Sequence, residues 1–138
     1  MANVQNVKTI VVPLYGGATD WQGDDVHMHI YKAPDADEGG NVQVLSAWAV
    51  MAAATGAGTS FSLALHNYGT AGTAVEGTVA AAMGGTADAA QWAADTPREF
   101  TISDGDLNAG EWLVLDKQED NSSDPTRGIV VVNILEGV

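Results

Sequence analysis

The stretch EFTISDGDLNAGEWLVLDK gathers acidic and amide side chains that could bind a calcium ion. Counting Asp104 as the first position of an EF-hand loop places Asp106 and Asn108 at the third and fifth positions, where that loop needs oxygen ligands. The sixth position is not Gly, however, and the twelfth is Leu115, an apolar strand residue, where a bidentate Glu is needed. The EF-hand interpretation fails. A weak cation site at Asp104, Asp106 and Asn108 remains the alternative to the interpretation we favour, a turn in which Gly110 adopts a left-handed φ.

A pair of histidines, His27 and His29, alternates with apolar residues in VHMHIYK. Two His one residue apart lie on the same face of a strand, which is a metal-binding geometry and raises the cupin family as an alternative. Cupins have a Gly six residues before the first His, where Trp21 stands here, and a Glu after the second, which is missing. Their third His also belongs to a Gly-rich motif that the surroundings of His66 do not match. We therefore expect a solvated or interfacial strand face, with no bound metal and no cofactor.

Other catalytic patterns are weak. The chain has no GxSxG elbow, and its Gly-rich segments lack the strand-to-helix context and the Lys of a phosphate loop. The carboxylate pairs Asp24/Asp25 and Asp35/Asp37 fall in turn-rich segments, where solvation is the simplest interpretation. The prediction is that the protein is not an enzyme.

Four tryptophans could contact a ligand or a partner. Trp48 and Trp112 fall within or at the start of strands and are expected in a core or an interface. Trp21 and Trp92 fall in loops and are the better candidates for contact. They keep open an alternative function, a carbohydrate-binding module or a tail-fibre component that stacks sugar rings on loop Trp residues.

Composition excludes several classes of partner. The chain has 138 residues, no Cys, and a net charge of −13 from 18 Asp and Glu against 5 Lys and Arg. So acidic a surface repels phosphate backbones and anionic lipids, which argues against nucleic-acid and membrane binding. No secretory signal pattern opens the sequence, so we expect synthesis in the cytoplasm.

Hydrophobic alternation between Gly- and Pro-rich turns predicts an all-β fold, an antiparallel β-sandwich that is jelly-roll-like. Pro13 marks the first strand as an edge strand. Residues 1–8 are expected to form a flexible arm, and residues 9–138 a single β-sandwich domain. The expected strands number about eight, near 8–15, 26–32, 42–54, 60–67, 75–83, 98–103, 111–117 and 128–136.

Two of these strands, in VQVLSAWAVMAAA and GIVVVNILEGV, are apolar on both faces. A strand of an antiparallel sandwich normally keeps one face wet, so a doubly apolar strand suggests a subunit interface. The candidate contacts with a capsid or a second subunit therefore include residues of these strands as well as residues of the arm and the loops. The full candidate set is Val4, Val7, Trp21, Trp48, Val50, Trp92, Val130 and Val132.

The Gly- and Ala-rich chain, its polar start MANVQNVKT, and its closing FTISDGDLNAGEWLVLDK and GIVVVNILEGV segments resemble the small jelly-roll decoration (cement or head-auxiliary) proteins of tailed bacteriophages. The likeness is densest over residues 97–138. It implies a structural virion protein on the outer capsid surface that binds the major capsid protein, forms a homotrimer and stabilises contacts between capsomers.

Overall fold

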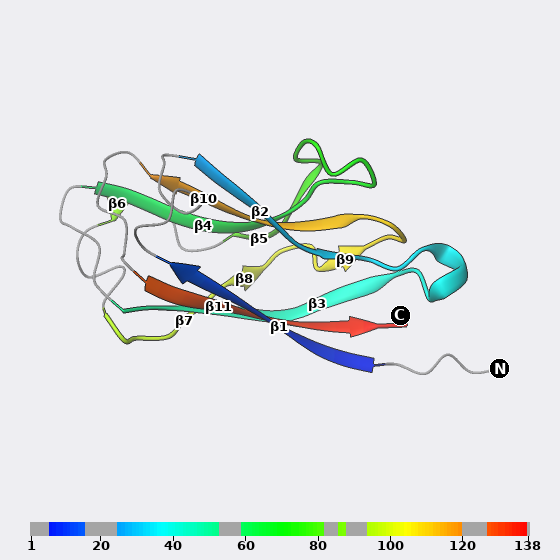
Figure 1. The fold of residues 1–138 in the computed structure, drawn as a ribbon, viewed down its shortest axis with the longest axis horizontal. Helices are drawn as coiled ribbons and strands as arrows, with labels where there is room; N and C mark the ends of the chain where they lie inside the picture. Colours follow the sequence, from blue (N-terminus) through cyan, green and yellow to red (C-terminus); the bar gives the residue numbers. More distant parts are fainter. Residues whose placement is uncertain are drawn as a thin grey trace.

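The structure, a computed structural model, describes residues 6–15, 25–52, 59–81, 86–87, 94–119 and 127–137. Two antiparallel β-sheets pack face to face, as Figure 1 shows. The elements are β1 (Asn6–Tyr15), β2 (Asp25–Lys32), the 3-10 turn η1 (Ala36–Glu38), β3 (Val42–Met51), β4 (Thr59–Asn67), β5 (Gly77–Ala81), β6 (Thr86–Ala87), β7 (Arg98–Glu99), β8 (Thr101–Ile102), β9 (Asp106–Leu107), β10 (Trp112–Glu119) and β11 (Arg127–Glu136).

The strand order is that of a jelly roll. The first sheet runs β1-β11-β3-β7, and the second runs β2-β10-β4-β5-β8. In each sheet, a strand from the C-terminal part of the chain, β11 or β10, lies between two strands from its N-terminal half. This is the double Greek-key arrangement. The predicted all-β, jelly-roll-like sandwich is confirmed. Residues 46–51, an Ala-containing stretch, belong to β3, although alanine favours helix.

β1 is the edge strand of the first sheet, as Pro13 predicted. It pairs with β11 over its whole length, from Asn6 opposite Glu136 to Tyr15 opposite Arg127. The expected limit of the arm at residue 8 needs correction, because residues 6–8 already belong to this ladder. Residues 1–5 of the expected arm lie outside the described residues.

The expected strand 98–103 is divided at Phe100, which corrects the prediction. β7 pairs with β3 in the first sheet, whereas β8, directly after Phe100, pairs with β5 in the second. Phe100 is only 4% exposed and lies in the core between the sheets. The chain thus crosses from one sheet to the other at a single buried aromatic side chain, and neither half can extend into a longer strand.

Small and medium apolar side chains form the core. Ala47, Ala49, Leu65 and Leu115 are fully buried between the sheets. Leu113 and Leu115 point inward, while Val114 and Asp116 point to the opposite face. Among the described residues, no helix is long and apolar enough to cross a membrane.

Candidate interaction surfaces

Along strands β1, β11 and β3, the outer face of the first sheet is largely apolar. The apolar inward residues of β1, β11 and β3 are buried or pack against the core, so the alternating residues between them face outward. The described residues of this outer face are Val7, Thr9, Val11 and Pro13 from β1, Ile129, Val131, Asn133 and Leu135 from β11, and Gln43, Leu45, Ser46, Trp48 and Val50 from β3. None of these residues of β1, β11 and β3 carries a charge, although the chain as a whole has a net charge of −13. Acidic residues lie at the margin of the face, where Glu99 of β7 stands opposite Trp48 and Asp106 of β9 stands opposite Gln43.

Several of these apolar side chains are well exposed. Val7 is 60% exposed, Val11 57% and Leu45 44%, and Ile129 is 37% exposed. Leu45 projects because it is the extra residue of a bulge, where the register with β11 shifts between Asn133 and Ile134. A contiguous exposed apolar area on a monomer marks a site of interaction with another macromolecule.

A row of polar side chains crosses the middle of this face, and its members are bonded to one another. The Thr9 hydroxyl donates to Asn133 Oδ1 at 2.7 Å, and Asn133 Nδ2 donates to the Ser46 hydroxyl at 3.0 Å. Because these groups already have protein partners, covering the row with another protein costs less than covering solvated polar groups would. The outer face is therefore suited to burial over its polar row as well as over its apolar residues.

At one end of the outer face there is an open depression of about 740 Å³. Trp48, Val50, Pro13 and Ile129 line it, and the segment around Asp95 and Pro97 forms one wall. Gly128 also lines it, and its neighbours approach closely: a Cβ there would lie 2.5 Å from Met51 Sδ and 2.7 Å from the Val50 carbonyl oxygen. The lining fits an apolar side chain.

The predicted contact residues divide into three groups. Val7, Trp48 and Val50 lie on the outer face, and the last two line its depression. Val4, Trp21 and Trp92 lie outside the described residues. The prediction that Val130 and Val132 are contact residues is wrong, because both are 0% exposed and pack between the sheets.

The second sheet carries a polar cluster on its own outer face. Asp116, in the middle of β10, has a side chain only 6% exposed, and it receives contacts from three neighbouring elements. His27 Nδ1 of β2 lies 2.5 Å from Asp116 Oδ1, and His66 Nδ1 of β4 bonds Oδ2. The Tyr68 hydroxyl donates to both carboxylate oxygens, at 2.9 Å each. Burial and these bonds to Asp116 raise the pKa of Tyr68 to about 12.

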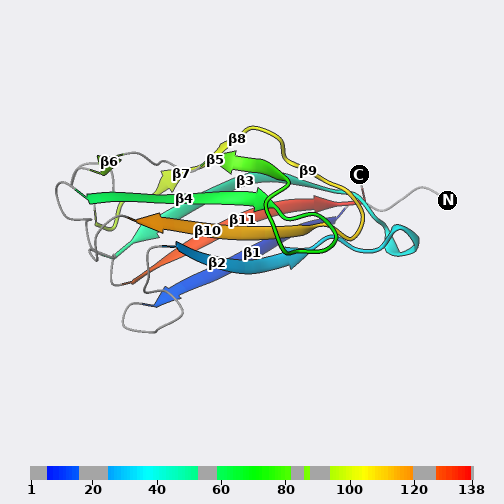
Figure 2. The same ribbon diagram turned by 90° about the horizontal axis from the view of Figure 1, so that it is seen from above.

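The same face holds the 68–76 loop, which connects β4 to β5 and lies across the ends of β10 and β2 (Figure 2). The His29 Nε2–H group donates to the Gly72 carbonyl oxygen at 2.7 Å. Gly72 has a φ of +68° and packs against the Trp112 ring, so that a Cβ there would lie 2.8 Å from Trp112 Cδ1. The His29 ring meets the Trp112 ring edge-on, with 5.4 Å between centroids.

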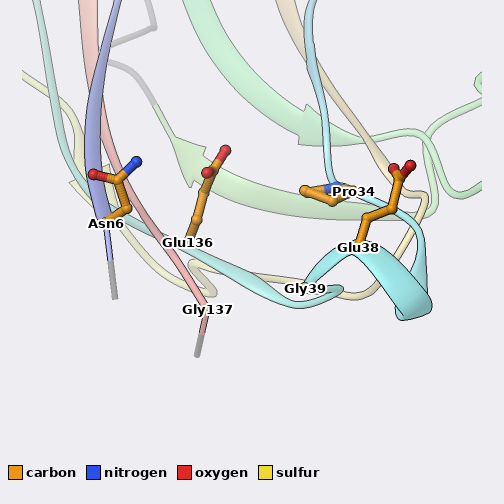
Figure 3. Close-up of a pocket in the computed structure, with 6 residues that line it drawn as sticks. All are labelled: Asn6, Pro34, Glu38, Gly39, Glu136 and Gly137. Atoms are coloured by element: carbon orange, nitrogen blue, oxygen red, sulfur yellow. The ribbon is translucent and has the colours of Figure 1, made fainter. Parts of the chain in front are cut away.

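A third feature is a small pocket of about 330 Å³ between the end of β11 and the turn around η1, shown in Figure 3. Glu136 and Glu38 line it. Glu136 accepts a hydrogen bond from the Tyr31 hydroxyl at 2.6 Å and an ion pair from Lys8 at 3.0 Å. The bond from Tyr31, aided by Lys8 and opposed by burial, lowers the pKa of Glu136, and burial raises that of Tyr31. Glu136 therefore already has partners within the chain.

The acidic segment around Asp104, Asp106 and Asn108 forms a turn. The Asp104 carboxylate accepts a bond from the Asp106 amide, the Glu111 carboxylate accepts one from the Asn108 amide, and Gly110 has a φ of +79°. The left-handed Gly110 is confirmed. Among the described residues, no group of three or more His, Asp or Glu side chains is arranged to hold a metal ion.

Sequence reasoning missed the convergence on Asp116. It placed His27 and His29 on one face but did not connect them to His66, Tyr68 or Asp116. A signal was present, because a carboxylate in the middle of an apolar strand needs hydrogen-bond partners if it is to be buried.

No protein-family model and no curated protein matches the chain. Among solved structures, the fold is similar to that of a chain in the acidic stable capsid structure of Helicobacter pylori bacteriophage KHP30, with a TM-score of 0.52 and 12% sequence identity, over 99% of this chain and 90% of that one. A chain in the structure of infectious bursal disease virus, Gx strain, also matches, with a TM-score of 0.49 and 17% identity, over 98% of this chain but 36% of that one. The similarity to the phage capsid chain extends over nearly the whole length of both chains, and it establishes a shared fold.

Proposed function

We propose that the chain is a structural virion protein, a decoration or cement protein that binds the outer surface of a phage capsid and stabilises contacts between capsomers. The observation that carries the proposal is the largely apolar outer face of β1, β11 and β3, whose residues named above are all uncharged in a chain of net charge −13. Its role is non-enzymatic, and its partners are the major capsid protein and other copies of the chain in a homotrimer. It is made in the host cytoplasm and ends in the virion.

The fold and the charge both support this proposal. The structural match covers 90% of a chain that belongs to a phage capsid structure, so the likeness is not limited to one domain of a larger protein. A strongly acidic protein is repelled by packaged DNA, which favours a place outside the shell over one that lines it.

The energetics suit attachment to a repetitive surface. Fully burying one Val, Leu or Ile contributes about 1.5–3 kcal/mol, so covering the four half-exposed side chains Val7, Val11, Leu45 and Ile129 contributes roughly 3–6 kcal/mol. Association costs about 4–15 kcal/mol in lost freedom, which leaves a single such contact weak. Copies joined to one another and to neighbouring capsomers gain from effective concentration, and a shell is held by many such contacts.

The test is co-sedimentation of the purified protein with capsids that lack it. Val11→Glu places an unpaired charge in the outer face, and we expect it to weaken binding at least tenfold, because a buried charge without a partner is costly. The matched control is Val75→Glu, since Val75 is 50% exposed but lies in the 68–76 loop of the other sheet. Equal binding by both variants and the unchanged protein would overturn the assignment of this face.

The oligomer is tested separately by light scattering at low and high salt. We expect the mass of a trimer, more fully formed at high salt, where repulsion between acidic copies is screened. A monomer at every salt concentration would refute the homotrimer, and the capsid-binding experiment would then decide the rest of the proposal alone.

A further inference from the structure

Two neighbouring hollows meet at Trp48, at one end of the outer face of the first sheet. One is the depression of about 740 Å³ described above, which Pro13, Val50 and Pro97 also line. The other, of about 330 Å³, is lined by Trp48, Pro97 and Glu99. Trp48 is half-buried, so part of it remains open to a group that enters either hollow.

Each hollow has an exposed carboxylate among its described lining residues. Glu99 of β7 stands directly opposite Trp48 of β3, and two residues opposite each other in an antiparallel pair project on the same face, with Cβ atoms about 4.5–5.5 Å apart. Asp95 lines the larger hollow. The Asp95 amide donates to the Met51 carbonyl oxygen at 2.7 Å, which fixes this turn to the end of β3. Trp48 therefore shares its surroundings with two carboxylates.

The cation next to Glu99 in the sequence points the other way. Arg98 stands opposite Ala49, which is fully buried, so the Arg98 side chain leaves β7 on the side of the core. Within the described part of the chain, neither Asp95 nor Glu99 takes part in an ion pair. Both residues are exposed and can be reached from solvent.

These surroundings suit a cation that is carried on an apolar stem. A tryptophan ring attracts the ammonium group of a Lys or the guanidinium group of an Arg placed over its face. Both side chains also bury their methylene stems along apolar surface while the charged head stays in contact with water. Here Pro13, Val50 and Ile129 offer apolar surface for the stem, and the two carboxylates can accept hydrogen bonds from the head.

A second copy of the chain is a poor source of that cation. It has 5 Lys and Arg against 18 Asp and Glu, and it carries the same net charge of −13. Lys8 and Lys32 already contact Glu136 and Asp35, and Lys117 is fully buried. The acidic surface of a second copy is repelled by this site, whereas a basic segment of another protein is attracted to it.

We propose that Trp48, Glu99 and Asp95 form a binding site for a single Arg or Lys side chain, presented by an exposed basic segment of a different protein. The stem of this side chain lies against Trp48 and the apolar wall of the depression, and its cationic head lies beside the two carboxylates. A side chain that is apolar to its tip fills the depression but offers the carboxylates no partner. The inference does not rest on the proposed function, because it concerns the chemistry of the occupant and is tested with isolated peptides.

The experiment is an NMR titration of the isotope-labelled protein with the peptide acetyl-Gly-Val-Arg-Val-Gly-amide, and with two peptides in which norleucine or Glu replaces the Arg. The shifts of the Trp48 indole Nε1–H group and of the Glu99 amide report binding at this site. We expect the Arg peptide to bind about fivefold more tightly than the norleucine peptide, which corresponds to about 1 kcal/mol, and the Glu peptide to bind most weakly. Equal binding of the Arg and norleucine peptides, or no shift at Trp48 and Glu99 with any of the three, would overturn the proposal.

Variants locate the effect. Asp95→Asn with Glu99→Gln removes two charges but keeps the size of both side chains, and we expect the preference for the Arg peptide to vanish. The matched control is Asp37→Asn with Glu38→Gln, which removes the same charge from exposed residues of η1, near the other end of β1, and should retain the preference. Persistence of the preference in the first double variant, or its equal loss in the control, would refute the assigned site. If the first double variant does not fold, the comparison of the Arg and norleucine peptides on the unchanged protein decides.

Discussion

Gly72 is the position where a single methyl group should most disturb the 68–76 loop. Its φ of +68° lies in the left-handed region, which costs an L-residue about 1–2 kcal/mol. In Gly72→Ala the new Cβ would also lie 2.8 Å from Trp112 Cδ1 and 3.0 Å from Nε1, closer than van der Waals contact. The ring is held edge-on by His29, so it must move against that contact, and overpacking of this kind costs about 1–3 kcal/mol. We expect a total loss of about 2–5 kcal/mol in the free energy of unfolding.

Two other glycines separate the two causes. Gly40 has a φ of +64°, but a Cβ there meets its nearest atom at an ordinary 3.5 Å, so Gly40→Ala should cost only the backbone share, about 1–2 kcal/mol. Gly77 has no positive φ and no atom within 4 Å of an added Cβ. Gly77→Ala should therefore stabilise the protein by about 0.4–1 kcal/mol, through the reduced entropy of the unfolded chain.

The assay is urea unfolding of the four proteins followed by tryptophan fluorescence, with stabilities compared at a common m-value. The expected order of stability is Gly77→Ala, the unchanged protein, Gly40→Ala and Gly72→Ala. A difference below about 0.5 kcal/mol between Gly72→Ala and Gly40→Ala would refute the claim that Trp112 and the loop are packed rigidly together.

Three further predictions concern buried groups. The pKa of Tyr68 is raised to about 12, so its contribution to stability is full below its ordinary pKa near 10 and is lost as the pH rises from 10 through 12. Between pH 9 and pH 11.5, the unfolding midpoint should therefore fall less in Tyr68→Phe than in the unchanged protein. The pKa of Glu136 is lowered, so its contribution is present above pH 4.5 and is lost as the pH falls through the folded value; Tyr31→Phe should move the NMR titration of the Glu136 carboxyl toward the ordinary range, and no movement would contradict the assigned cause. Leu115 is fully buried between the sheets, and Leu115→Ala should cost about 2–5 kcal/mol in urea unfolding, whereas a loss below 1 kcal/mol would mean that the core collapses around the gap.

Sequence patterns were sufficient where the residue types of a strand distinguish its two faces. In β10 the alternation around Leu113 and Leu115 gave the inward face directly, and Pro13 identified an edge strand because it cannot donate to a ladder. In β11, the sequence pattern does not show which face is buried. Val130, Val131 and Val132 are identical residues, so their sequence carries no information on which parity faces the core.

Contacts between distant strands were also beyond periodicity. The meeting of His27, Asp116 and His66 depends on the register of β10 with two neighbours, and a bulge between Leu113 and Val114 shifts one of these registers. The split at Phe100 depends on where the chain leaves one sheet for the other. Such features follow from tertiary pairing, which a local pattern of residues does not encode.

The bonded row of Thr9, Asn133 and Ser46 has a consequence for geometry. Hydrogen bonds and ion pairs across an interface fix the relative angle of two proteins, because they weaken steeply when misaligned. Here the polar groups are directed at each other, and the surrounding apolar contacts are non-directional. A partner resting on this face is therefore free to pivot by a few degrees at little cost. In a curved lattice, quasi-equivalent positions differ slightly in their local angles. A chain that binds through such a face could occupy all of these positions without changing its own conformation.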